Sequence, residues 1–182
     1  RMVKEAVSLA KSRGQLIGYS SINVFAPTSK SLGYYGSAFL DLPIDVGGKT
    51  LINSQLVGQV GTMNSPVPSW KVFAHEYGHF LGMYDYYIPG TGTSGKSPGP
   101  FDFMGNTSGN ANSFFGFQRW VQGWIEDSDV ICDYTINSSI SHSLTPLNQI
   151  FGKKIYVHPF DGTLALVVEF RTESEFDALE GN

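Results

Sequence analysis

The feature that most constrains this chain is a short central run in which two histidines are separated by three residues. Glu76 directly follows His75, and His79 is followed by Gly82 and Asp85. Successive residues of an α-helix are rotated by about 100°, so histidines four positions apart lie on one face, one turn apart. Two such imidazoles can bind one metal ion, and a neighbouring acidic residue can act on water bound to that ion. The run therefore predicts a zinc-binding helix.

A third ligand from this run requires the helix to stop. Six residues past His79, a continued helix would carry Asp85 about 240° round and away from the metal. Gly82 readily adopts the left-handed conformation that ends a helix. We therefore expect a helix over about residues 69–82, after which Asp85 folds back as the third ligand. Capping of the loop is the alternative role for Asp85, and two exposed helix histidines would be the simpler interpretation of the pair alone.

The apolar residues of the predicted helix fall on the side opposite to the histidines, at about 140–260° from His75. They are Trp70, Phe73, Ala74, Tyr77, Phe80 and Leu81. We expect this stripe to anchor the helix in a core while the histidines face a cleft.

Composition limits the class of protein. A chain of 182 residues can bury a core as one domain or as two tightly packed subdomains. A net charge of −4 argues against nucleic acid as the main partner. The sequence has no apolar run of about 18 residues, so we expect no transmembrane segment. Its single cysteine, Cys132, excludes an intrachain disulfide.

The remaining pattern predicts an α+β fold. Apolar residues at helical spacing predict a surface helix from Met2 to a stop at Gly14, and a second helix over 113–125. Strands are expected at 22–25, 37–42, 50–57, 153–157 and 164–170, with Asp161-Gly162 as a turn. We expect Thr50–Val57 to be the sheet edge along which an extended substrate pairs.

Three blocks of the chain resemble one family. They are Val-Phe-Ala-His-Glu-Tyr-Gly-His-Phe-Leu-Gly-Met-Tyr-Asp at 72–85, Phe-Asp-Phe-Met-Gly at 101–105 and Gly-Phe-Gln-Arg-Trp-Val-Gln-Gly-Trp-Ile at 116–125. In this combination they resemble the immune inhibitor A-like (M6) metallopeptidases, a branch of the metzincin-type zincins. Val168-Glu169-Phe170-Arg171 resembles a downstream strand of the same family. The resemblance covers about residues 72–171.

The resemblance implies a zincin-like catalytic domain over 1–130, with a mixed sheet, an active-site helix, a Met-turn and a C-terminal helix. The Met-turn is 101–105, in which Met104 packs beneath the metal. A β-rich extension over 131–182 follows, and we expect it to be truncated, so that the chain is a fragment of a longer protein. The resemblance also implies secretion and protein or peptide substrates.

The expected chemistry is hydrolysis of peptide bonds. Zinc would be held by His75, His79 and Asp85, with Glu76 as general base and then general acid. Two alternatives stay open: a catalytically silent binding or adhesion module that kept the fold, and a zinc amidase acting on substrates other than proteins.

Residues outside the motif have simpler interpretations. Asp102 and Asn106 flank the Met-turn with oxygen ligands that suit a structural calcium ion, although turn formation explains them as well. Trp120 and Trp124 are expected in the core, whereas His142 and His158 are interpreted as surface or core histidines. These interpretations leave the metal-binding run as the main functional hypothesis.

Overall fold

In the computed structural model the chain forms two compact units, residues 1–86 and 87–182, and each is described by itself. The structure describes residues 2–16, 18–19, 21–27, 36–39, 44–45, 50–51, 53–60, 69–87, 101–107, 113–136 and 139–173. The fold mixes a few helices with short strands, which confirms the expected α+β character. No described helix is both long enough and apolar enough to cross a membrane. The predicted domain division at residue 130 stays a prediction.

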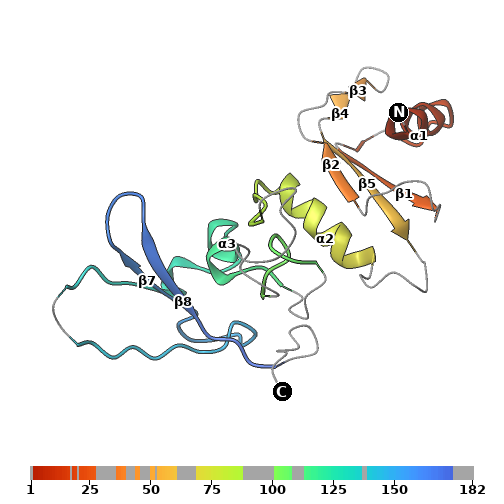
Figure 1. Ribbon diagram of the computed structural model, residues 1–182. Helices are drawn as coiled ribbons and strands as arrows, with labels where there is room; N and C mark the ends of the chain where they lie inside the picture. The colour runs from red at the N-terminus through yellow and green to blue at the C-terminus, as the bar shows by residue number, and fades with distance from the viewer. Residues whose placement is uncertain are drawn as a thin grey trace. The chain divides into compact units, whose positions relative to one another are not determined.

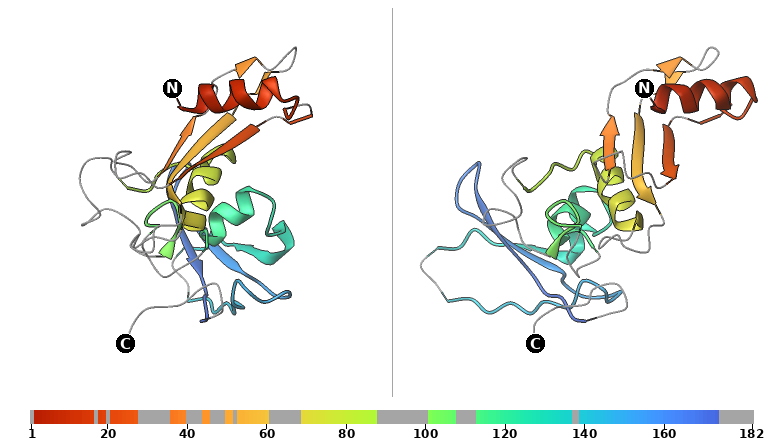
Figure 2. Two further views of the ribbon diagram at one scale, coloured as in Figure 1. Left: turned by 90° about the vertical axis from the view of Figure 1, so that its right-hand side faces the viewer. Right: turned by 45° about the vertical axis from the view of Figure 1, so that its right-hand side comes forward.

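The first unit begins with the predicted surface helix, α1 (Met2–Ser12). Val3 and Val7 are buried while the intervening residues are largely exposed, as the helical spacing predicts. Gly14, with a φ of +68°, ends the helix at the expected position. The helix contacts the three-stranded sheet and lies across one of its ends (Figure 2).

That sheet has the order β1-β5-β2 (Figure 1). Its strands are β1 (Ser21–Pro27), β5 (Asn53–Val60) and β2 (Gly36–Phe39). β5 pairs in parallel with β1, with Ser21 opposite Asn53, and antiparallel with β2, with Phe39 opposite Ser54. A separate two-stranded sheet pairs β3 (Ile44–Asp45) with β4 (Thr50–Leu51).

The expected substrate-binding edge at Thr50–Val57 was wrong. This stretch is divided between β4 and β5, and β5 is the central strand of its sheet. The backbone groups of a central strand are already paired on both sides, so they are not free to pair with a substrate.

The second helix of the first unit is α2 (Ser69–Phe80), which contacts β5 and β2. The ring of Phe73 stacks on Phe25 of β1 with centroids 5.7 Å apart. The predicted burial pattern of this helix was only partly right, because Trp70 is 49% exposed and Tyr77 is 40% exposed. Val72 and His75 are buried instead, so the histidine-bearing side of the helix is itself covered.

The described residues of the second unit form one short helix, a 3-10 turn and a sheet of order β6-β7-β8. The elements are α3 (Gly116–Val121), η2 (Asp127–Asp129), β6 (Val130–Cys132), β7 (Ile155–Pro159) and β8 (Ala165–Glu169). β7 pairs in parallel with β6 and antiparallel with β8, and β7 and β8 form a hairpin (Figure 1). The predicted strands at 153–157 and 164–170 are therefore confirmed.

One side of this sheet is buried in a small core made by Ile125, Leu147, Ile155 and Val157. Trp120 packs against this core, as expected. The prediction for Trp124 was wrong, because its side chain is 53% exposed and its ring only borders Phe114, 5.9 Å away.

α3 is shorter than the predicted helix over 113–125. It starts after Phe115, whose backbone is extended (φ −55°, ψ 148°) and whose N–H donates to the Asp102 carboxylate at 2.5 Å. A tertiary hydrogen bond therefore holds the preceding residues out of the helix. The helix ends before Gly123, which has a φ of +72°.

Candidate metal centre

α2 places His75 and His79 on one face, one turn apart. Their ring centroids are 5.0 Å apart and the ring planes are nearly perpendicular, at 88°. His75 is 5% exposed and Glu76 is 7% exposed, so the face that carries the motif is shielded from bulk water. The predicted pairing of the two histidines is confirmed.

The chain then turns back at Gly82, as the sequence predicts. Gly82 has a φ of +84°, and its N–H donates to the His79 carbonyl at 3.0 Å. The N–H of Met83 donates to the Gly78 carbonyl at 3.0 Å, which completes the hydrogen-bond pattern of a Schellman helix end. This turn brings Asp85 to the histidines: its Oδ1 lies 3.1 Å from His75 Nε2 and 3.4 Å from His79 Nε2.

The hydrogen bonding of His79 decides which lone pairs face the centre. Its Nδ1 lies 2.9 Å from the Met83 carbonyl oxygen, which can only accept, so Nδ1 carries the hydrogen. In a neutral imidazole Nε2 then presents a lone pair, and this nitrogen faces Asp85 Oδ1. Although the two atoms are close, Asp85 Oδ1 is buried and makes no hydrogen bond. Two acceptors in contact are stable only with a cation or a proton between them.

The geometry of these three residues fits a metal ion of zinc's size. One ligand atom from each of His75, His79 and Asp85 lies within 4.8 Å of the other two, and the described residues contain no other such group. Tetrahedral zinc with bonds of about 2.0–2.1 Å requires ligand atoms roughly 3.3 Å apart. The distances from Asp85 Oδ1 to the two Nε2 atoms, 3.1 and 3.4 Å, are close to this value. Two imidazole nitrogens and a carboxylate oxygen are also ligands that zinc accepts.

Comparisons of the chain with protein-family models, with curated proteins and with solved structures find no match. The interpretation of the centre therefore depends on its own residues.

The predicted Met-turn is a tight turn in the second unit. The N–H groups of Gly105 and Asn106 donate to the Asp102 carbonyl at 3.1 and 2.9 Å, and Met104 is fully buried. The predicted turn and the burial of Met104 are confirmed, and its role beneath a metal stays a prediction.

Asp102 is the carboxylate that organises this turn. Its Oδ1 accepts the N–H of Met104 at 2.7 Å and its Oδ2 accepts that of Phe115 at 2.5 Å, which is the turn-forming role. Burial raises the pKa of Asp102 to about 6, against the lowering effect of these two bonds and of Arg171. The calcium site expected here stays a prediction.

Sequence reasoning missed two residues that bind this turn to the rest of the second unit. Glu169 accepts the N–H of Gly116 at the start of α3 at 2.5 Å and pairs with Arg171 Nε at 2.5 Å. Arg171 also donates to the carbonyls of Phe101 at 2.7 Å and Phe114 at 3.3 Å. The signal was available, because residues two apart in an extended segment point to the same side, and Glu169 and Arg171 carry opposite charges.

Proposed function

We propose that this chain carries the catalytic region of a zinc-dependent endopeptidase. The observation that carries the proposal is the convergence of His79 Nε2 and the unbonded Asp85 Oδ1, with His75 Nε2 3.1 Å from the same oxygen. The resemblance of the motif blocks to the immune inhibitor A-like metallopeptidases and the zincin-type fold belong to this proposal, as do protein or peptide substrates and secretion.

Each residue of the centre has a definite task. His75, His79 and Asp85 would hold zinc, which would act as a Lewis acid that activates water and polarises the substrate carbonyl. The Met83 carbonyl fixes the ring orientation and tautomer of His79, as hydrogen-bond partners of metal-ligating histidines generally do. The Asp85 carboxylate compensates one positive charge of the ion.

Glu76 moves the proton. It belongs to the same helical turn as His75 and is almost fully buried, so its carboxylate acts where water competes little. Glu76 accepts a proton from the attacking water and donates it to the leaving amine as the peptide bond breaks.

The test is Glu76→Gln, which keeps the size of the side chain and removes its basicity. We expect stoichiometric zinc by metal analysis and a loss of cleavage of an unfolded protein by about 10²–10⁴-fold. Glu126→Gln is the matched control, because Glu126 is exposed and belongs to the second unit. This variant should cleave the unfolded protein at the wild-type rate.

Full activity of Glu76→Gln would contradict the assigned role. Stoichiometric zinc in the wild type without cleavage of any protein or peptide would instead support the silent binding module. Hydrolysis confined to amides of other molecules would support the zinc amidase.

A further inference from the structure

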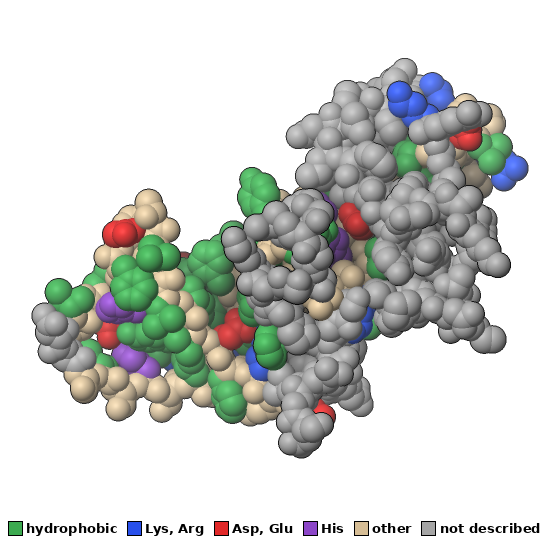
Figure 3. All heavy atoms as spheres, in the orientation of Figure 1, with side chains coloured by type: hydrophobic (Ala, Val, Ile, Leu, Met, Phe, Trp, Pro, Cys, Tyr) green, Lys and Arg blue, Asp and Glu red, His purple; other side chains and the backbone are tan. Residues whose placement is uncertain are grey.

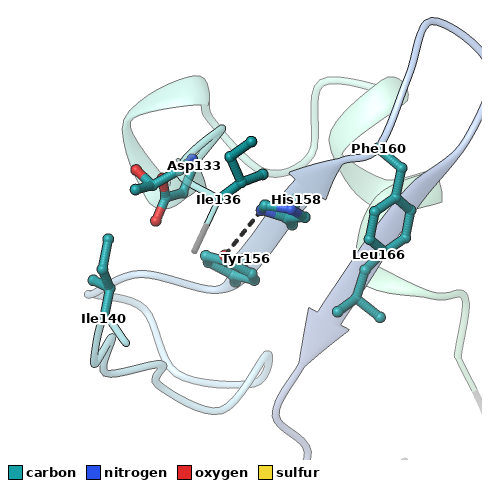
Figure 4. A pocket seen from close by; sticks show the side chains of 8 residues that line it. Asp133, Ile136, Ile140, Tyr156, His158, Phe160 and Leu166 are labelled. Atoms are coloured by element: carbon teal, nitrogen blue, oxygen red, sulfur yellow. Dashed lines mark hydrogen bonds between the residues drawn. The ribbon is translucent and has the colours of Figure 1, made fainter. Parts of the chain in front are cut away.

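A second candidate site lies on the outward face of the β7–β8 hairpin. The register places Tyr156 opposite Val168 and His158 opposite Leu166, while the alternate residues Ile155 and Val157 face the core. The segment that follows β6 borders this face, and a cavity of about 470 Å³ lies there. Figure 4 shows Asp133 and Ile136 near one end of the cavity and Phe160 with Leu166 at the other.

Four aromatic rings form a row on this face, and three of them, Tyr156, His158 and Phe160, line the cavity. The centroids of His142 and Tyr156 are 5.0 Å apart, those of Tyr156 and His158 are 6.5 Å apart, and those of His158 and Phe160 are 5.4 Å apart. The Tyr156 hydroxyl lies 3.5 Å from His158 Nδ1 (Figure 4). Histidine side chains lie among hydrophobic ones on this part of the surface (Figure 3). The row therefore offers exposed aromatic surface to a ligand.

One fixed negative charge accompanies the rings. Asp133 Oδ1 accepts the N–H of Thr135 at 2.8 Å, and Oδ2 lies 3.2 Å from His142 Nε2. Hydrogen bonds from the side chain and backbone of Thr135, and then from His142, lower the pKa of Asp133 to about 2. The carboxylate is thus ionised and held in one orientation.

The cavity supplies no strong positive charge in return. None of its lining residues is Lys or Arg. The nearby Lys153 and Lys154 are engaged elsewhere, by the carbonyls of Ser128 and Phe151 respectively. The imidazole of His158, which lines the cavity, and that of the neighbouring His142 carry a charge only when protonated. Asp133 is the one carboxylate among the described residues that line the cavity.

We propose that this cavity binds a monovalent organic cation, either a guanidinium or an alkylammonium group. Such an ion is attracted by the negative faces of aromatic rings and by a carboxylate. A guanidinium is also more weakly hydrated than an ammonium, so its transfer to an apolar cavity costs less. An anion would be repelled by Asp133. A neutral ligand would gain no charge interaction.

The test compares ligands that differ in charge and not in shape. N-acetylargininamide, its uncharged citrulline counterpart and tetramethylammonium are titrated into the full chain at pH 8, with binding followed by calorimetry and by the NMR signals of the His158 ring. We expect the arginine derivative to bind at least about tenfold more tightly than the citrulline derivative. Tetramethylammonium binding as well would indicate an alkylammonium ligand, whereas its failure beside arginine binding would indicate a guanidinium group.

The variants are Asp133→Asn, Tyr156→Leu and the matched control Asp161→Asn. Asp161 also accepts a backbone N–H two residues ahead, from Thr163 at 2.6 Å, but lies outside the cavity. We expect Asp133→Asn to abolish the preference for arginine over citrulline and Asp161→Asn to retain it.

Tyr156→Leu keeps the carboxylate and removes the central ring, so the affinity for the cation that binds should fall at least about fivefold. Equal binding of the two amino-acid derivatives by the wild type would overturn the proposal. Retention of the preference in Asp133→Asn, or no saturable binding of any cation, would also overturn it.

Discussion

At the scale of single residues, glycine decides where each described helix ends. Gly14, Gly82 and Gly123 all have a φ between +68° and +84°. In each case the glycine and the next residue donate to carbonyls of the last helical turn in the same pattern. Only the turn at Gly82 leads to a proposed metal ligand, because Asp85 follows it by three residues.

The paired substitutions Gly82→Ala and Gly14→Ala separate strain from function. A Cβ at either position meets nothing within 4 Å, so the cost of about 1–2 kcal/mol comes from the left-handed backbone alone. We expect both variants to lose similar unfolding free energy by chemical denaturation. Zinc affinity should fall only in Gly82→Ala. An equal fall in Gly14→Ala would contradict a specific role of the Gly82 turn in metal binding.

Asp102 gives the second unit a distinctive pH dependence. Burial raises its pKa to about 6, above the usual 3.8 of an aspartate, so the folded state holds the proton more tightly than the unfolded state. Its contribution to stability is therefore complete below about pH 4 and is lost as the pH rises through 6. This rise in the pKa of Asp102 corresponds to roughly 3 kcal/mol of unfolding free energy.

The measurement is the difference in unfolding free energy between wild type and Asp102→Asn at several pH values. We expect the wild type to lose stability relative to the variant between pH 4 and pH 7. Asp161→Asn is the control with the opposite sign, because hydrogen bonds to Thr163 and Leu164 lower the pKa of Asp161. The contribution of Asp161 is lost as the pH falls, and the same sign in both variants would contradict the assignment.

At the scale of elements, local patterns predicted the helices and most strands but not their surroundings. The periodicity of Val3 and Val7 was enough for α1, because one buried stripe suffices for a surface helix. For α2 the same reasoning placed Trp70 and Tyr77 in the core, and both are exposed. A helical wheel shows which residues share a face, and the elements that cover that face come from distant parts of the chain.

The start of α3 is a junction where packing and helix propensity predict opposite results. A Cβ on Gly116 would meet Glu169 Oε2 at 2.9 Å and side-chain atoms of Ile155 and Leu147 at 3.2 Å. Helix propensity alone predicts that Gly116→Ala raises the unfolding free energy by about 1 kcal/mol. Overpacking around the added methyl group lowers it by about 1–3 kcal/mol. We expect a net loss of stability in thermal unfolding.

Gly162→Ala is the control for this junction, since its Cβ meets nothing within 4 Å. It should leave the melting temperature nearly unchanged. A stabilised Gly116→Ala variant would show that the side chains around Gly116 move to accommodate the methyl group. It would also show that the contact with Glu169 does not restrict this position.

At the scale of the whole molecule, the sequence was enough to predict the candidate site but not the order of the strands in the sheet. The spacing of His75, His79, Gly82 and Asp85 is enough to predict their meeting, because all of them belong to one helix and its terminal turn. The central position of β5 depends on a parallel pairing with β1, about 30 residues earlier. No local pattern encodes such a pairing, and the predicted substrate edge failed for this reason.

Metal removal should affect the two units differently. At a free zinc concentration of 100 times the dissociation constant, binding stabilises the folded state by about 2.7 kcal/mol. We expect a chelator to speed amide hydrogen exchange in α2 and to leave exchange in β7 unchanged. Asp85→Ala should abolish the zinc effect, and His142→Ala, which lies outside the centre, should preserve it. Equal zinc effects on α2 in both variants would contradict the proposed ligands.

The Schellman turn at Gly82 also has a kinetic consequence. It brings together groups that are only ten residues apart in the chain, from His75 to Asp85. Closing a loop of that length takes roughly 10–100 ns and costs little chain entropy, whereas pairing β1 with β5 requires a much longer closure. An ion with these ligands can therefore be captured as soon as α2 and its turn have formed, before the sheet is complete. Early capture would make the metal a participant in folding of the first unit.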